Sequence, residues 1–221
     1  DAQLRIGNVD TTTATVAITI GGVLQETVNI APGASYRVNY PTLDAGPVKV
    51  ESTDNKKIVV ALREAWNNQQ TGLLASTSFA QVMGIPAEKL SDTYLLPHYN
   101  DLSPLLDAQL RIGNVDTTTA TVAITIGGVL QETVNIAPGA SYRVNYPTLD
   151  AGPVKVESTD NKKIVVALRE AWNNQGTGLL SSTSFTQLMG LPLEDLSVIY
   201  YLPHYNDLSP LLDAQLRFGV P

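Results

Sequence analysis

Two histidines are the first candidates for chemistry in this chain. His98 and His204 each lie in the sequence PHYND, with Asp101 or Asp207 three residues later. A histidine beside a carboxylate can serve acid–base catalysis or bind a metal. A hydrolase also needs a positioned nucleophile, and a metal site needs more ligands than these. We therefore interpret both histidines as structural, and we predict no catalytic residue, no metal site and no cofactor.

Aromatic side chains form a second candidate site. Ring faces stack well on the apolar faces of sugars, although packing inside a core is the alternative use of such rings. The candidate platform comprises Trp66, Tyr94 and Tyr99 in the first half of the chain, and Trp172, Tyr200 and Tyr205 in the second half. Exposure discriminates between the two uses, because a ligand platform needs open, coplanar rings.

Carboxylate and amide oxygens offer a further candidate, a calcium site. Glu51, Asp54 and Asn55 form one such group, and Asn100 with Asp101 forms another. Neither group has the spacing of a recognised calcium loop. Arg63 and Glu64, at the end of an apolar run, are interpreted as structural charges.

The elements that carry these residues are organised by an internal repeat. The stretch DAQLRIGNVD begins at Asp1, recurs 106 residues later at Asp107, and begins again as DAQLRFG at Asp213. A fixed period of this kind must be found before any fold is assigned. It predicts domains at residues 1–106 and 107–212, with residues 213–221 as the first strand of a partial third repeat.

The two full copies are nearly identical. Residues 1–69 and 107–175 match at every position, and all ten differences fall between residues 70 and 95 of the first copy. Substitutions clustered in this way indicate that residues 70–95 have different surroundings in the two copies.

Composition excludes several classes of function. The net charge is −7, which disfavours electrostatic capture by nucleic acid or anionic lipid. The chain has no cysteine, so it has no disulfide, thiolate metal site or cysteine nucleophile. There is no apolar run long enough to span a membrane as a helix. With 43% hydrophobic and 16% charged residues, the chain is globular rather than disordered.

Apolar residues alternate with polar residues within each copy, which is typical of half-buried strands. The run ATVAITIGGVLQETVNI predicts a hairpin at Gly21-Gly22, and turns follow at Pro32-Gly33 and Asp54-Asn55. Six or seven short strands in each copy predict two tandem antiparallel Ig-like β-sandwich domains, with a closed barrel as the alternative. The predicted core of the first domain comprises Leu4, Ile6, Val16, Ile18, Ile20, Tyr36, Val38, Val48, Val60 and Leu62.

The last third of each copy is less regular. Ser78 followed by Gln81 resembles a capping box, which predicts a helical turn over 79–83, and Pro86 predicts a second short turn. The following stretch, YLLPHYNDLSPLL, is apolar and contains two prolines, whereas a flexible linker is rich in glycine and serine. We expect this junction to be packed and the domains to hold a fixed angle.

Several segments together resemble a known family. LRIGNVDTTTATVAITIGG, PGASYRVNY, GPVKVES, VALRE and SFAQVMGIP…LSDTYLLPHYN are similar to a tandem repeat of roughly 100 residues in secreted and cell-surface bacterial proteins. The resemblance covers nearly the whole chain, twice. It implies extracellular β-sandwich modules in arrays and no catalytic residues.

The partial third repeat indicates how such modules could assemble. An added first strand can close the second domain or pair with another chain, because an unpaired strand edge recruits further strands. The predicted strand-sharing interface comprises Leu4, Ile6, Leu110, Ile112, Leu216 and Phe218.

These patterns predict a non-enzymatic, extracellular or cell-surface structural protein, a rigid stalk, surface-layer or fibre unit that binds copies of itself. An adhesin or carbohydrate-binding module that recognises cell-surface glycans is the alternative.

Overall fold

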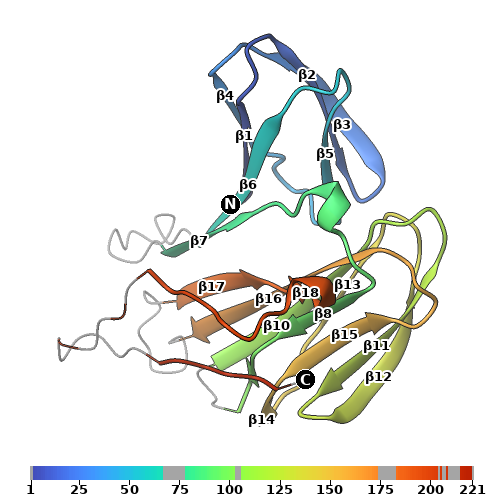
Figure 1. Ribbon diagram of the computed structural model, residues 1–221, viewed down its shortest axis with the longest axis vertical. Coiled ribbons are helices and arrows are strands. Elements are labelled where there is room, and N and C mark those ends of the chain that lie inside the picture. Colours follow the sequence, from blue (N-terminus) through green and yellow to red (C-terminus); the bar gives the residue numbers. More distant parts are fainter. Residues whose placement is uncertain are drawn as a thin grey trace.

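The computed structural model describes residues 2–66, 78–102, 106–173, 183–203, 205, 208 and 215–220 (Figure 1). At Trp66, Trp172, Asn173, Thr183 and Phe185 only the backbone is described. Within these ranges the regular structure is antiparallel β, with two short 3-10 turns, η2 (Ala87–Lys89) and η4 (Leu193–Asp195). The protein is therefore all-β, as its alternating pattern predicts. No helix among these residues is long and apolar enough to cross a membrane.

The first copy forms two sheets around one core, which we call the N-terminal unit. One sheet has the order β4-β1-β6-β7 and the other has the order β3-β2-β5. Leu4 and Ile6 of the first sheet share a buried cluster with Val16 and Ile18 of the second, so the sheets face each other. The strands are β1 (Ala2–Asn8), β2 (Ala14–Ile20), β3 (Val23–Ile30), β4 (Ser35–Val38), β5 (Val48–Ser52), β6 (Ile58–Trp66) and β7 (Ser78–Met83).

The second copy forms the C-terminal unit in the same way, but its second sheet is larger. The first sheet has the order β13-β10-β16-β17, and the second has the order β12-β11-β15-β8-β18. A short pair, β14-β9, lies beside them. The strands are β8 (Thr93–Leu96), β9 (Tyr99–Asn100), β10 (Leu106–Asn114), β11 (Ala120–Ile126), β12 (Val129–Ile136), β13 (Ser141–Val144), β14 (Asp150–Ala151), β15 (Val154–Ser158), β16 (Ile164–Asn173), β17 (Thr183–Met189) and β18 (Leu191–Pro192).

Local sequence accounts for the strands and turns of both units. β2 alternates strictly between buried and half-buried positions, which is the period of two expected for a strand covered on one face. Gly21 and Gly22 turn the chain with φ of 58° and 76°, values in the left-handed region that glycine adopts at no steric cost. The hairpin predicted at Gly21-Gly22 is confirmed.

Two local predictions for the end of the first copy have different outcomes. The helical turn over 79–83 is wrong, because Ser78–Met83 is strand β7, paired in register with β6 from Trp66 to Ala61. The sheet edge of β6 supplies hydrogen bonds that outweigh the capping-box signal. The short turn after Pro86 is confirmed as η2.

The predicted core of the N-terminal unit is mostly correct. Residues of β1 and β2 are buried, and Tyr36, Val38, Val60 and Leu62 pack against them. Val48 is the exception, because it is 39% exposed on β5.

The boundary between the units does not coincide with the end of the first repeat at residue 106. β8 and β9 precede residue 106, yet β8 pairs with β15 and β9 pairs with β14 in the C-terminal unit. Figure 1 shows the chain passing from β7 of the N-terminal unit through η2 into the sheet of the C-terminal unit. The C-terminal unit is therefore completed by a segment of the first repeat.

Candidate interface between repeats

The segment from Ser91 to Asp101, which we call the donor segment, joins the two repeats and is the best-developed site in the described structure. Its strand β8 lies between β15 and β18, with Tyr94 opposite Val156 and Leu96 opposite Val154. A strand inserted at a sheet edge satisfies its own backbone groups and those of the edge.

Backbone hydrogen bonds fix both ends of the donor segment. The amide of Ser158 donates to the carbonyl oxygen of Asp92 at 2.7 Å, and the amide of Ile164 donates to Ser91 at 3.0 Å. At the other end, the amide of Asp101 donates to the carbonyl oxygen of Leu149 at 2.7 Å. These bonds fix the register of the donor segment on the C-terminal unit.

Three side chains of the donor segment enter the core of the C-terminal unit. Tyr94, Leu96 and Tyr99 belong to its buried cluster, and both tyrosines are 0% exposed. The Tyr99 hydroxyl donates to the carbonyl oxygen of Ala108 at 2.8 Å and accepts from the amide of Tyr146 at 2.7 Å. Burial raises the pKa of both tyrosine hydroxyls above the ordinary value.

His98 also serves this contact. Its Nε2 lies 2.8 Å from Oδ1 of Asp150, on the strand that pairs with β9. Asp101 instead accepts from the amide of Ala108 at 3.4 Å, and burial raises the pKa of its carboxyl. The His98–Asp101 pair considered for catalysis does not form, while His204 and Asp207 lie outside the described residues. No group of three or more metal-ligating side chains gathers within the described ranges.

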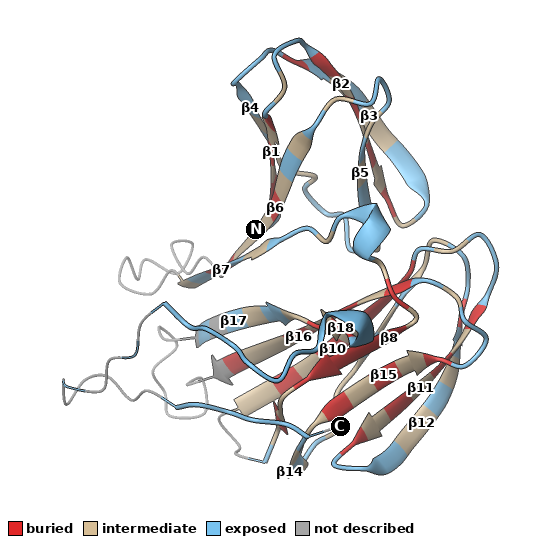
Figure 2. Ribbon diagram, viewed as in Figure 1, coloured by how far each residue is buried: buried red, intermediate tan, exposed pale blue. Residues whose placement is uncertain are grey.

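The N-terminal unit provides an internal comparison, because its sequence through Gln69 is identical to that of the C-terminal unit. Val154 and Val156 are fully buried beside the donor segment, as Figure 2 shows along β15. Their counterparts on β5 are more open: Val48 is 39% exposed and Val50 is half-buried. Since the residues are the same, the difference comes from what lies next to the strand.

The room around equivalent glycines also differs between the two units. A Cβ on Gly190 would meet Tyr94 of the donor segment at 3.1 Å, whereas the three atoms nearest to a Cβ on Gly84 all belong to Val60, at 3.6 to 3.9 Å. A Cβ on Gly152 would lie 2.5 Å from the carbonyl oxygen of Pro97. Gly84 and Gly190 are equivalent positions, so the N-terminal unit is open where the C-terminal unit holds Tyr94.

Direct contacts between the units add to the donor segment. Arg111 of β10 donates to both carboxylate oxygens of Glu64 at 3.0 and 3.1 Å, with both side chains about three-quarters buried. Arg143 makes a bidentate pair with Asp44 at 3.0 Å, although both of these side chains are largely exposed. Bidentate pairing fixes the orientation of the two groups as well as their distance.

The same contacts recur one repeat later. Arg217 donates to Glu170 at 3.1 Å, and these residues lie 106 positions after Arg111 and Glu64. A Cβ on Gly219 would meet Pro153 at 2.8 Å, just as one on Gly113 would meet Pro47 at 2.8 Å. Residues 215–220 thus lie on the C-terminal unit as the start of the second repeat lies on the N-terminal unit.

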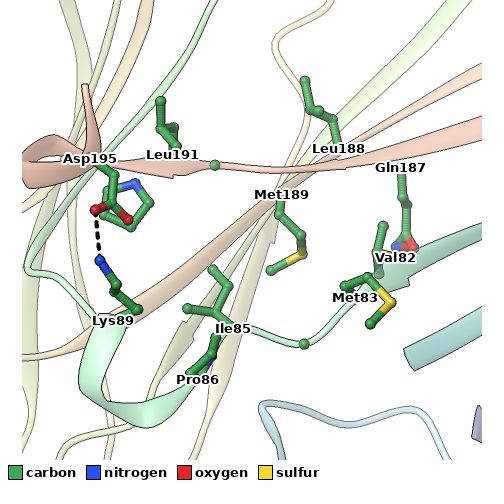
Figure 3. A pocket seen from close by; sticks show the side chains of 13 residues that line it. Val82, Met83, Ile85, Pro86, Lys89, Gln187, Leu188, Met189, Leu191 and Asp195 are labelled. Atoms are coloured by element: carbon green, nitrogen blue, oxygen red, sulfur yellow. Dashed lines mark hydrogen bonds and ion pairs between the residues drawn. The ribbon is translucent and has the colours of Figure 1, made fainter. Parts of the chain in front are cut away.

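A groove of about 450 Å³ runs between β7 and β17 (Figure 3). Its walls are mostly equivalent positions of the two repeats, among them Met83 and Met189. Lys89 pairs with Asp195 at 3.0 Å, and these are also equivalent positions. One of the ten substitutions therefore converts a like-charge contact into an ion pair, which agrees with the expectation that residues 70–95 have different surroundings.

One buried polar atom beside this groove has no partner among the described residues. Gln187 Oε1 is unsatisfied, whereas its counterpart Gln81 accepts from Arg5 at 3.1 Å. In the second repeat the equivalent arginine, Arg111, pairs with Glu64 instead. Contact between the repeats thus redirects this arginine.

The residues predicted to form a strand-sharing interface do not lie in the strand that joins the two repeats. Leu4, Ile6, Leu110 and Ile112 are core residues of β1 and β10, each an interior strand of its own unit. Leu216 and Phe218 are 50% and 85% exposed and lie in no described strand. The element shared between the repeats is β8, not the DAQLRIG strand.

The predicted ligand platform is not assembled in the described structure. Tyr94 and Tyr99 have no exposed surface, while Tyr200 and Tyr205 are 59% and 54% exposed. The side chains of Trp66 and Trp172 lie outside the described set. Arg63, at the end of the same strand as Trp66, stacks on Phe79 at 5.2 Å from the ring centre.

Residues that the sequence did not single out carry much of the interface. Ser91 and Asp92 accept backbone hydrogen bonds through their carbonyl oxygens, and the Ser91 hydroxyl also donates to Glu194 at 3.1 Å. Two sequence signals pointed to this region, the clustering of substitutions in 70–95 and the apolar, proline-containing stretch over 94–106.

The chain was compared with family models, curated proteins and solved structures, and none of them matches.

Proposed function

We infer that this protein is a non-enzymatic structural module of an extracellular or cell-surface repeat array. In this proposal each unit is an Ig-like β-sandwich, and successive units are held at a fixed angle to form a stalk, surface layer or fibre. The recurrence of the same contacts at a spacing of 106 residues carries the proposal. The contact of Arg111 with Glu64 recurs as the contact of Arg217 with Glu170, so the start of each following repeat is held against the preceding unit by the same pair of residues.

Rigidity is supported by the kind of connection between the units. The donor segment is hydrogen-bonded to the C-terminal unit near both of its ends and along β8, rather than spanning solvent. Two further ion pairs, Arg111–Glu64 and Arg143–Asp44, join the units from other strands. Contacts at several separate points oppose rotation about any single hinge.

Pulsed electron resonance between two spin labels tests this proposal. The chain has no cysteine, so Thr12→Cys and Thr118→Cys place one label on an exposed, equivalent position of each unit. We expect a single narrow distance distribution. Adding Arg111→Ala and Arg143→Ala should broaden it, whereas the matched control Arg5→Ala with Arg37→Ala should not. A broad distribution in the parent chain would refute the rigid module.

A glycan-binding adhesin is the second candidate. The exposed rings of Tyr200, Tyr201 and Tyr205 favour it, since exposed aromatic faces can stack on sugars. Binding of the intact chain to an array of cell-surface glycans, lost on Tyr200→Ser with Tyr201→Ser, would support this candidate. Absence of binding would leave the structural module.

A further inference from the structure

We propose that residues 198–202 of one molecule insert beside β5 of a second copy, so that the chains assemble head to tail. This inference rests on the proposed structural function and names its partner. The register follows from β8 on β15: Tyr200 lies opposite Val50, Tyr201 opposite Lys49, and Leu202 opposite Val48.

The acceptor is the edge of the N-terminal unit. β5 has a strand on one side only among the described residues, and its sequence VKVES is that of β15, which does hold a donor. Val48 is exposed and Val50 half-buried, while both counterparts are fully buried by the donor. An open apolar strand edge of this kind is a template for strand addition.

The donor is the part of the second repeat equivalent to β8. Residues 198–203 are described but form no strand, and Val198, Tyr201 and Leu202 are 99%, 91% and 70% exposed. Apolar side chains at such exposure need a partner surface to be buried. The equivalent segment of the first repeat has that surface in the C-terminal unit.

The free donor already has the local structure of the bound one. The amide of Ser197 donates to the Tyr200 hydroxyl at 2.9 Å, and the amide of Ile199 donates to Ser197 Oγ at 3.2 Å. The bound donor makes the same two bonds at Ser91 and Thr93, at 3.2 and 3.1 Å. Preorganisation of this kind reduces the entropy lost on binding.

The substitutions between the two donors respect the buried face. Tyr94 and Leu96, which enter the core, are unchanged as Tyr200 and Leu202. Within the span of β8 only the alternate positions differ, Thr93 becoming Ile199 and Leu95 becoming Tyr201. The face that must fit the acceptor core is therefore the same in both donors.

Residues 215–220 occupy the place that the incoming copy needs. They correspond to residues 3–8, so β1 of a second copy would take their position and Arg5 would replace Arg217 on Glu170. Removing residues 213–221 should therefore strengthen assembly.

A disulfide trap tests the register directly. Lys49→Cys and Tyr201→Cys place the only two thiols opposite each other and away from the core, on side chains that are 65% and 91% exposed. Opposed residues of antiparallel strands lie within the range that a disulfide spans. Mild oxidation across a concentration series should give covalent dimers and longer chains.

The control pairs Lys49→Cys with Val198→Cys. Val198 is 99% exposed, so its thiol is at least as accessible. It lies three residues from the matched position, about 10 Å along a strand, which is beyond disulfide reach. We expect cross-linking about tenfold slower than for the matched pair. Equal rates, or a cross-link confined to the monomer, would overturn the proposal.

Tyr200→Ser, introduced into the matched pair, supplies an independent check. The matched pair should then cross-link no faster than the control pair. The melting temperature of the monomer should stay unchanged, because Tyr200 is 59% exposed. Persistence of rapid cross-linking would overturn the proposal. A narrow distance distribution between the spin labels without rapid cross-linking would reject strand insertion and leave the rigid module standing. Rapid cross-linking with a broad distance distribution would reject the rigid module and leave strand insertion standing.

Discussion

Tyr99 is the side chain that ties the end of the donor segment to the C-terminal unit. Its ring packs edge-on against Tyr146 at 5.9 Å, and its hydroxyl joins two backbone groups. Removal of the hydroxyl would leave the amide of Tyr146 without this partner in a buried place, whereas the carbonyl oxygen of Ala108 still accepts from the Asn145 side-chain amide at 2.8 Å.

Tyr99→Phe should therefore destabilise the C-terminal unit by about 1–3 kcal/mol, the usual cost of one buried polar group that loses its partner. Chemical denaturation followed by tryptophan fluorescence measures the change. Tyr201→Phe is the control, because Tyr201 is 91% exposed, and it should change stability by less than about 0.5 kcal/mol. Equal effects of the two substitutions would contradict the assigned role of Tyr99.

Buried tyrosines also predict how stability depends on pH. Burial raises the pKa of Tyr94 and Tyr99, and burial with a hydrogen bond to Glu132 raises that of Tyr142 and Tyr146. An unfolded tyrosine ionises near pH 10, so above that pH the unfolded state releases protons that the folded state retains. Stability should be complete below about pH 10 and should fall as pH rises beyond it. Urea denaturation at a series of pH values tests this, and a midpoint that is constant or rises up to pH 12 would contradict it.

At the scale of elements, β5 and β15 are one sequence in two settings. β15 has β11 on one side and β8 on the other, whereas β5 has only β2 among the described residues. The backbone amides on the open side of β5 therefore have less protection from solvent.

Hydrogen exchange should be faster in β5 than in β15. A Lys49→Arg substitution at an exposed position gives the two otherwise identical peptides different masses. Intrinsic exchange rates are nearly equal for such similar sequences, so the ratio reports local protection. Equal protection in dilute solution would mean that β5 is already covered.

Gly152 and Gly46 offer a second matched comparison. A Cβ at Gly152 would clash with the Pro97 carbonyl oxygen at 2.5 Å, whereas a Cβ at Gly46 would meet the movable hydroxyl of Ser141 at 3.0 Å. Gly152→Ala should cost about 1–3 kcal/mol in thermal unfolding, as overpacking does, and Gly46→Ala should cost less. If Gly46→Ala were the more damaging change, the donor segment would not be packed as described.

The strands of this protein can be predicted from the sequence where one face of the strand is buried and the other face is exposed to solvent. β2 alternates and was predicted, together with its hairpin. β8 has the sequence TYLL and is buried at all four positions, so it lacks alternation that could identify it. β7 carries a local helix signal that pairing with β6 overrides. Patterns within one segment cannot report a neighbour that arrives from elsewhere in the chain.

At the scale of the whole molecule, the period of 106 residues predicted two similar units, but not where one ends. A periodic sequence can be divided at any phase, and division at DAQLRIG assigns β8 and β9 to the first unit. Hydrogen bonding assigns them to the second. The aromatic residues show the same limit, because Tyr94 is buried and Tyr200 exposed in equivalent positions.

The groove between β7 and β17 gives a prediction about contact between the units. Lys89→Asp would place two carboxylates together at the Lys89–Asp195 contact, where the side chains are 57% and 35% exposed. Surface pairs contribute little, so we expect a loss of about 0.2–1 kcal/mol at low salt and less at high salt. The reciprocal change Asp195→Lys, added to Lys89→Asp, should restore stability in calorimetry. Failure of the double variant to recover would show that the two residues do not interact.

The position of β8 along the chain also bears on synthesis. β8 precedes every strand of the unit that it completes, so a ribosome releases it before β10 to β17 appear. When the strands of the C-terminal unit emerge from the ribosome, β8 has already emerged and is tethered to them by the chain. Its completion requires no segment from a later repeat, which limits the time during which the nascent edge of β15 stays open to unrelated chains.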